Sequence, residues 1–314
     1  MTSPKATTHD AAFEQIDRII AGVGRIERRV SDYILALQRE LSPESSITLE
    51  VAEQLSLLSG RVAYLFTGFV VPSRYPKGEN GGPLGALALA RALRSAGLRP
   101  TLWVDPQLVD TALWLAAELA VTIPVQAIDL AELEKRRSEP AVAIAIEKPG
   151  NNNQGIMHTF DGLAISSGSL SIDALFLHWN ASQTLTMAIG DRGNEIGFGA
   201  LSEPIARWAP SSLTCQCGCG GGVVASTPAQ RVLPAAVSNW GAYGIAAALA
   251  LLAGDTTGLL EPAEEERMLR VAAVRGCVDG ICRRGCYGVD GLPGMTSVAV
   301  VQALKDTVLD ALRG

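Results

Sequence analysis

The sequence of 314 residues predicts an α/β fold, in which a largely parallel sheet is flanked by helices and preceded by an N-terminal helical segment. Two observations support this prediction. Short, continuously apolar runs alternate along the chain with segments of helical spacing, which is the pattern of parallel strands joined by crossover helices. The runs contain few polar positions, as expected of strands that are covered on both faces of the sheet.

The composition fits a large buried core and excludes several classes of protein. Hydrophobic residues make up 48% of the chain, which excludes a disordered protein, and only 18% are charged. The net charge of −6 provides no general attraction to nucleic acid or to an anionic membrane. The longest apolar run, around residues 242–253, is too short for a membrane span, and the acidic N-terminus lacks the apolar stretch of a secretory signal. We therefore expect a cytoplasmic protein that binds a small molecule, and neither nucleic acid nor a membrane.

The N-terminal part is predicted to be helical. Between residues 11 and 41 apolar side chains recur at steps of three or four residues, and Gly22 and Gly24 could divide this segment into two helices. We expect residues 1–10 to form a disordered tail and residues 11–58 to form helices within a single domain, 11–314. These helices could brace the sheet or provide the contact of a homodimer.

Five strands are expected after these helices. The first is RVAYLFT, a continuous apolar run that ends at Gly68. The predicted strands cover residues 61–67, 99–104, 123–128, 141–147 and 184–189, and helices occupy most of the intervals between them. A buried, alanine-rich helix follows at 242–253 and a last helix at about 296–312. Together these elements predict a Rossmann-like arrangement of three layers.

Three polar loops come directly after predicted strands, at residues 68–82, 147–162 and 190–199. In parallel α/β sheets, ligands bind beyond the carboxyl ends of the strands. We therefore expect the three loops to converge on one site.

The loop GDRGNEIGFG, residues 190–199, carries the strongest candidate residues. Its four glycines allow a sharp turn and a close approach of the backbone to a ligand. Asp191 and Glu195 place two carboxylates on one short loop, where they could share a divalent cation, bind an amine or act as an acid and base pair. Alternatively, Asp191 or Asn194 could cap the helix that follows.

The loop at residues 68–82 supplies candidate ligands for an anion. Arg74 and Lys77 could hold a carboxylate, the arginine through a two-point fork. Glu79 and Asn80 precede a helix that begins near Pro83, and a helix N-terminus also favours anions. The alternative is a solvated loop without a ligand.

Other polar residues allow more than one interpretation. His158, in the loop 147–162, could be catalytic or structural. Ser238 or Asn239, in the segment VSNWGAYG, could cap the buried helix, and Asp290 lies in a turn before the last helix. The sequence contains neither a dinucleotide fingerprint after a strand nor a phosphate-binding P-loop, so no nucleotide cofactor is expected.

The six cysteines fall into two triplets. They are Cys215, Cys217 and Cys219, followed by Cys277, Cys282 and Cys286. Without a secretory signal, structural disulfides are not expected. The two triplets could meet to hold zinc or an iron–sulfur cluster, although neither has the C-x2-C spacing of common sites. The alternative is that they are ordinary thiols.

Taken in order, these motifs resemble the D-glutamate cyclase family. The resemblance extends over residues 13–313 and rests on FEQIDRII near the N-terminus, LFTGF at 65–69, ENGGPLGA at 79–86, WVD at 103–105, GDRGNEIGFG at 190–199, VSNWGAYG at 237–244 and VDGLP at 289–293. In vertebrates this unit is similar to the C-terminal part of a longer mitochondrial protein. A free-standing chain of this length resembles a bacterial form.

The resemblance implies conversion of D-glutamate to 5-oxo-D-proline and water, by a hydro-lyase that could use Mg²⁺ or Mn²⁺. It places Asp191 and Glu195 in catalysis or at the metal. The substrate would be bound by Arg74, Lys77, Glu79, Asn80, Arg192, Asn194 and Asn239. The chain departs from the family pattern at Gly81, Arg192 and Gly288, and it has no histidine shortly after Pro293. A diverged member that binds an amino-acid-like or acidic metabolite without cyclising it is therefore the alternative.

Overall fold

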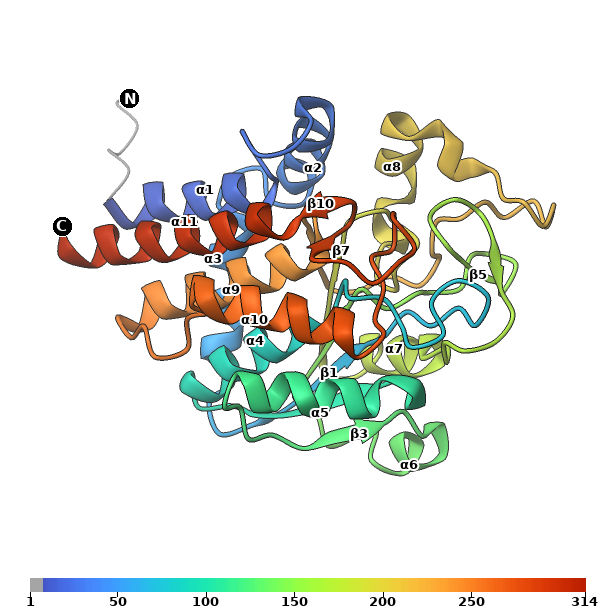
Figure 1. Ribbon diagram of the computed structural model, residues 1–314, viewed down its shortest axis with the longest axis horizontal. Helices are drawn as coiled ribbons and strands as arrows, with labels where there is room; N and C mark the ends of the chain where they lie inside the picture. Colours follow the sequence, from blue (N-terminus) through green and yellow to red (C-terminus); the bar gives the residue numbers. More distant parts are fainter. Residues whose placement is uncertain (1–7) are drawn as a thin grey trace.

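The computed structural model describes residues 8–314 and confirms the three-layer α/β fold (Figure 1). Residues 1–7, which make up most of the predicted tail, lie outside the described residues, and helix α1 already begins at Thr8. The centre is a six-stranded parallel sheet in the order β3-β2-β1-β4-β7-β8. Its strands are β1 Val62–Thr67, β2 Arg99–Val104, β3 Val125–Ala127, β4 Val142–Ile146, β7 Leu185–Gly190 and β8 Arg231–Pro234.

The strand order places a topological switch point between β1 and β4. From β1 the chain builds outward through β2 to β3, then returns to β4 and builds outward in the other direction. The loops after β1 and β4 therefore separate to opposite sides, and this leaves a crevice where α/β proteins bind ligands. The five predicted strands are confirmed to within about two residues. The sequence analysis missed β8, which has only four residues, begins with arginine and ends with proline.

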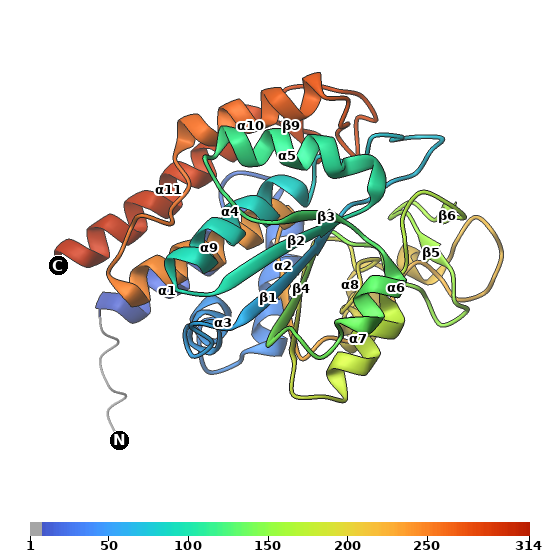
Figure 2. The same ribbon diagram turned by 90° about the horizontal axis from the view of Figure 1, so that it is seen from below.

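The helices cover both faces of the sheet (Figure 2). On one face, a large core joins the sheet to α1, α3, α4, α5, α9, α10 and α11; on the other, an aromatic core joins it to α2, α6, α7 and α8. The helices are α1 Thr8–Ile20, α2 Arg28–Leu41, α3 Ile47–Ser56, α4 Pro83–Ser95, α5 Val109–Glu118, α6 Leu130–Lys135, α7 Asp173–Asn180, α8 Ser202–Trp208, α9 Ser238–Ala253, α10 Pro262–Val274 and α11 Gly294–Arg313. Two short antiparallel pairs lie outside the sheet, β5 Met157–His158 with β6 Ala164–Ile165 and β9 Gly288–Val289 with β10 Leu292–Pro293.

Alternation along β1 divides the two cores. Ala63 and Leu65 face the larger core, whereas Tyr64 and Phe66 face the aromatic one. The five residues from Ala63 to Thr67 are all buried, as predicted for a strand covered on both faces. None of the described helices is long and apolar enough to cross a membrane.

Helix α9 is buried along almost its whole length and packs closely against α4. A Cβ added at Gly85 would lie 2.8 Å from the Cα of Asn239, so the contact requires glycine. Neither Ser238 nor Asn239 caps α9, whose N-cap is Val237; that prediction was wrong. Instead, Asn239 Oδ1 accepts hydrogen bonds from the N–H groups of Gly82 and Gly85, at 2.8 and 2.9 Å, and so satisfies the first turn of α4.

A buried ion pair joins the carboxyl ends of three neighbouring strands. Lys148 Nζ lies 2.8 and 2.7 Å from the two carboxylate oxygens of Asp105 and 3.3 Å from the carbonyl oxygen of Gly68. Asp105 follows β2, Gly68 follows β1 and Lys148 comes just after β4, and both charged side chains are fully buried. Burial lowers the pKa of Lys148 and raises the pKa of Asp105, and their mutual attraction opposes both shifts.

Replacing Lys148 by methionine is expected to lower the free energy of unfolding by about 3–5 kcal/mol, because it leaves the Asp105 carboxylate buried without a counter-charge. Urea denaturation monitored by circular dichroism measures the effect. The control is Lys135→Met, at an exposed lysine with a loose contact to Glu132, for which we expect a change within about 0.5 kcal/mol. Equal stability of the two variants would contradict the role of the pair.

Candidate active site

The candidate site is a small, narrow cavity beyond the carboxyl ends of β1, β4 and β7, partly open to solvent, with a volume of about 10 Å³ that the centre of a water molecule can reach. The three predicted loops converge there, as expected from the sequence. The segment before α11 also contributes to the wall. The lining residues are Phe69, Tyr75, Glu79, Glu147, Phe160, Asp191, Arg192, Asn194, Ile281 and Asp290. In this conformation the cavity has room for about one water molecule, so a ligand the size of an amino acid requires its walls to move apart.

Four carboxyl groups line the cavity, from Glu79, Glu147, Asp191 and Asp290. Glu147 is the first residue after β4 and Asp191 the first after β7, so the neighbouring strands deliver both groups to the same edge. The Oδ2 atom of Asp191 and the Oδ1 atom of Asn194 are buried and accept no hydrogen bond from the protein. The wall therefore presents oxygen acceptors that are available to a ligand.

Burial gives this cluster unusual protonation properties. It raises the pKa of Glu79, Glu147 and Asp191 well above the ordinary range, and the carboxylates raise one another's pKa values further. Burial also raises the pKa of Asp290, to about 6. At neutral pH the cluster can therefore hold protons that exposed carboxylates would have lost, which is the property required of a general acid.

Glu195 lies beneath the cluster and holds the loop in place. Its Oε1 atom accepts hydrogen bonds from the N–H groups of Asp191 and Arg192, at 3.0 Å each, and its Oε2 atom accepts one from Gly193 at 2.7 Å. Neither Asp191 nor Asn194 caps the short helix after the loop, whose N-cap is Phe198, so the capping alternative was wrong. Carboxylate oxygens of Glu147, Asp191 and Glu195 lie within 4.8 Å of one another and could share a divalent cation.

Arg192 is the single cationic side chain among the described residues that line the cavity. Its Nε atom lies 3.6 Å from Asp191 Oδ1, and its guanidinium stands 5.2 Å from the centre of the Phe160 ring. Burial alone would lower the pKa of Arg192, but the surrounding carboxylates raise it. The side chain is 39% exposed, so it can both remain charged and reach a ligand at the mouth.

The structure does not bring all the predicted site residues to the cavity. Asp191, Arg192, Asn194 and Glu79 line it, and Glu195 supports it, whereas Arg74, Lys77, Asn80 and Asn239 are not among the lining residues. Asn80 Nδ2 donates to the carbonyl oxygen of Gly288, and Lys77 is exposed.

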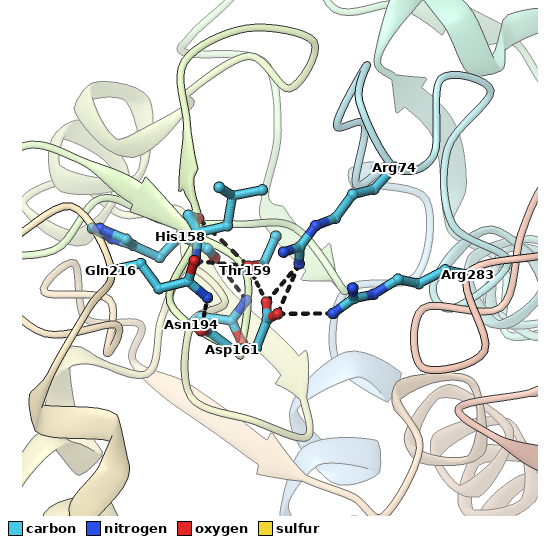
Figure 3. Close-up of polar contacts among 8 residues, drawn as sticks. Arg74, His158, Thr159, Asp161, Asn194, Gln216 and Arg283 are labelled. Carbon is cyan, nitrogen blue, oxygen red and sulfur yellow. Dashed lines mark hydrogen bonds and ion pairs between the residues drawn. The ribbon is translucent and has the colours of Figure 1, made fainter.

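Arg74 is occupied by another carboxylate. Its Nη1 atom lies 2.7 and 2.9 Å from the two oxygens of Asp161, which also pairs with Arg283 at 2.8 Å (Figure 3). Arg74 thus binds a carboxylate, but through the single atom Nη1 rather than a two-nitrogen fork, and the carboxylate belongs to a side chain of the loop 147–162. The two ion pairs of Asp161 therefore join the loop 147–162 to the loop after β1, through Arg74, and to the segment before α11, through Arg283.

The sequence analysis missed Glu147 and Asp290 as site residues. Both have left-handed backbone conformations, with φ of 47° and 51°, which is uncommon for residues other than glycine. Such strain collects at functional sites. Glu147 could have been found from its place at the end of a buried strand, whereas Asp290 reaches the cavity only through the packing of a distant segment.

The fold and the site define an α/β protein with an acidic cavity beside a topological switch point. Residues 38–305 match the family model described as D-glutamate cyclase-like, C-terminal, so the chain belongs to the D-glutamate cyclase-like family. The human protein named D-glutamate cyclase, mitochondrial is 27% identical over 298 residues, an alignment that covers 80% of this chain. The chain spans about half the length of that relative, 46%.

Replacing Asp290 by asparagine is expected to stabilise the protein at neutral pH. Because folding raises the pKa of this carboxyl group from 3.8 to about 6, its contribution to stability is complete below about pH 4 and is lost as the pH rises through 6. Asparagine stays neutral and tolerates positive φ. We expect Asp290→Asn to melt on the order of 2–4 °C above the wild type at about pH 7.5.

The difference should disappear towards about pH 4, where the aspartic acid is also neutral. Thermal melts of both proteins in the same buffer without added metal measure it. Asp306→Asn, at an exposed position of α11, is the control and should leave the pH dependence unchanged. A melting temperature of Asp290→Asn that stays parallel to the wild type at all pH values would contradict the assignment.

Proposed function

We propose that this chain cyclises D-glutamate to 5-oxo-D-proline with release of water. The observation that carries the proposal is the group of four buried carboxyl groups with raised pKa values, facing a small cavity that has one cationic side chain. Membership of the D-glutamate cyclase-like family supports the same reaction.

The charges of the cavity suit an amino dicarboxylate. Carboxylates of the cluster would bind the α-ammonium group, and Arg192 would hold a substrate carboxylate through its guanidinium fork. The unpaired acceptors on Asp191 and Asn194 would receive N–H donors of the amine. Phe69, Tyr75 and Phe160 would cover the methylene groups of the substrate, folding the chain so that its ends approach.

The chemistry needs one proton acceptor and one proton donor. An ionised carboxylate of the cluster takes a proton from the ammonium group, and the free amine attacks the carbon of the γ-carboxyl group. A protonated member of the cluster keeps that γ-carboxyl group neutral and therefore electrophilic. The C–N bond forms, the nitrogen loses a second proton, and one carboxyl oxygen leaves as water with both protons. The net charge of the substrate is unchanged, so the cluster ends with the protons it began with.

A divalent cation also fits this donor set. Mg²⁺ and Mn²⁺ prefer carboxylate oxygens, and Glu147, Asp191 and Glu195 would hold the ion. Such an ion would supply Lewis-acid polarisation of the γ-carboxyl group. In that state the same residues orient the substrate, and proton transfer falls to Asp290 and Glu79, which are outside the ligand set.

The proposal is tested by incubating the purified chain with D-glutamate or L-glutamate, with and without Mg²⁺ or Mn²⁺, and measuring 5-oxoproline by mass spectrometry. We expect product from the D-isomer and a loss of at least about 100-fold in Asp191→Asn, which removes the carboxylate at the centre of the cluster. Glu203→Gln, at an exposed position in α8, is the control and should retain activity.

Binding without turnover is the alternative outcome, favoured by the additional cation that Arg192 brings to the loop. A thermal-shift series with D-glutamate, 5-oxoproline and related acids identifies it as stabilisation without product. Folded protein that forms no 5-oxoproline under any of the metal conditions would exclude cyclase activity.

A further inference from the structure

The first cysteine triplet does not meet the second, but it meets a histidine. The group formed there, named the Cys3His cluster below, consists of His158, Cys215, Cys217 and Cys219. One ligand atom of each residue lies within 4.8 Å of those of the other three. The cluster lies outside the residues that line the cavity, and none of its cysteines forms a disulfide.

The distances within the cluster suit four ligands around one ion. Cys215 Sγ lies 3.4 Å from both Cys217 Sγ and Cys219 Sγ, and His158 Nε2 lies 3.2 Å from Cys217 Sγ. Tetrahedral zinc with bonds of about 2.3 Å to sulfur and 2.0–2.1 Å to nitrogen requires separations of roughly 3.8 Å between sulfurs and 3.6 Å between sulfur and nitrogen. These three separations need an expansion of a few tenths of an ångström, and the other three are at most 4.8 Å.

The tautomer of His158 prepares its Nε2 atom for a metal. Nδ1 lies 3.1 Å from the carbonyl oxygen of Ile156, which can only accept, so Nδ1 carries the proton. The lone pair of Nε2 therefore faces the thiols. Histidine ligands of zinc commonly donate their second N–H group to a carbonyl in this way.

The backbone around the cysteines directs their thiols to one side. Gly218 and Gly220 have φ values of 71° and 78°, so the chain turns after Cys217 and again after Cys219. Two donors also approach Cys219 Sγ, the N–H group of Gly221 and Asn152 Nδ2, each at 3.4 Å, and so hold the sulfur in place.

Hydrogen bonds hold the cysteine segment against the loop 147–162 without a metal. Gln216 donates from its backbone N–H to the carbonyl oxygen of Gly162 at 2.8 Å. Its Nε2 atom donates to the carbonyl oxygen of Asp161, also at 2.8 Å (Figure 3). Asn152 Nδ2 donates to the carbonyl oxygen of Gly222 at 2.8 Å. The four ligands are therefore brought together by the fold, and an ion would find them already arranged.

We propose that the Cys3His cluster binds one structural zinc ion that fastens the cysteine segment to the loop 147–162. Four protein ligands leave no open position, which is the property of structural rather than catalytic zinc sites. The ion would also support the cavity, because the backbone oxygen of His158 accepts a hydrogen bond of 3.0 Å from Asn194 Nδ2 (Figure 3). An iron–sulfur cluster fits less well, since it places its ligands on several iron atoms and separates them further than the observed 4.8 Å.

Two cysteines of the second triplet form a separate group with an aspartate, and this group provides a control. Asp279, Cys282 and Cys286 also lie close together, but Asp279 Oδ1 already accepts N–H groups of Ile281 and Cys282, and its Oδ2 accepts that of Gly291. This aspartate fixes a turn, and the group offers an ion three ligand atoms, one fewer than the Cys3His cluster. Cys282→Ser is thus a matched substitution of an exposed cysteine outside the Cys3His cluster.

The test is elemental analysis of the full chain purified without chelator, followed by Co²⁺ titration of the metal-depleted protein. We expect about one zinc ion per chain, and with Co²⁺ the intense visible bands of tetrahedral coordination and a thiolate charge-transfer band in the near ultraviolet. The zinc content per chain of the double variant Cys215→Ser/Cys217→Ser should fall at least about tenfold, whereas that of Cys282→Ser should equal the wild type.

Three outcomes would overturn the proposal. They are folded wild-type protein that binds neither ion, zinc that persists in the double variant, and zinc that is lost in Cys282→Ser. The cobalt spectrum of the wild type decides the question even if the double variant fails to fold. Because the readouts are metal content and spectrum, they stand apart from cyclase activity.

Discussion

The ion pair between Lys148 and Asp105 is the interaction on which the site depends, because it joins the ends of β2 and β4 across β1. A parallel sheet aligns its strands by main-chain hydrogen bonds, but those bonds stop where the strands end. Beyond those ends, Lys148 holds the three strands together by contacting both the Asp105 carboxylate and the carbonyl oxygen of Gly68. Glu147 stands directly before Lys148 and is thereby fixed at the floor of the cavity.

The cavity concentrates groups that would repel one another if all were ionised. The fold tolerates them in two ways. Glu195 is satisfied by three backbone N–H groups of its own loop, and the remaining carboxyl groups have raised pKa values and can share protons. The same burial of carboxyl groups that costs stability gives the cavity protons to exchange with a ligand, which is a common relation between stability and activity.

The sheet could be predicted from the sequence because its strands are continuous apolar runs, and the convergence of three loops followed from the rule that ligands bind at the carboxyl ends. Partners distant in sequence could not be predicted. Arg74 has the chemistry of a carboxylate ligand, yet its carboxylate belongs to Asp161, and Asn239 looked like a cap for its own helix but caps α4. Likewise, the C-x-C-x-C spacing alone did not predict a four-ligand group, because its fourth member, His158, is brought beside the cysteines only by the fold.

Glu147 and Lys148 are neighbours in the chain, but their side chains lie in different places. The side chain of Glu147 lines the cavity, whereas that of Lys148 is buried against Asp105. A deletion of one residue before Glu147 would place the ammonium group of Lys148 among the carboxylates and leave Asp105 unpaired, and an insertion there would place the carboxylate of Glu147 beside Asp105. Both the site and the core would fail in a single event. The surrounding loops can change length independently, but this dipeptide has no freedom of register, so the evolution of the cavity is tied to that of the sheet beneath it.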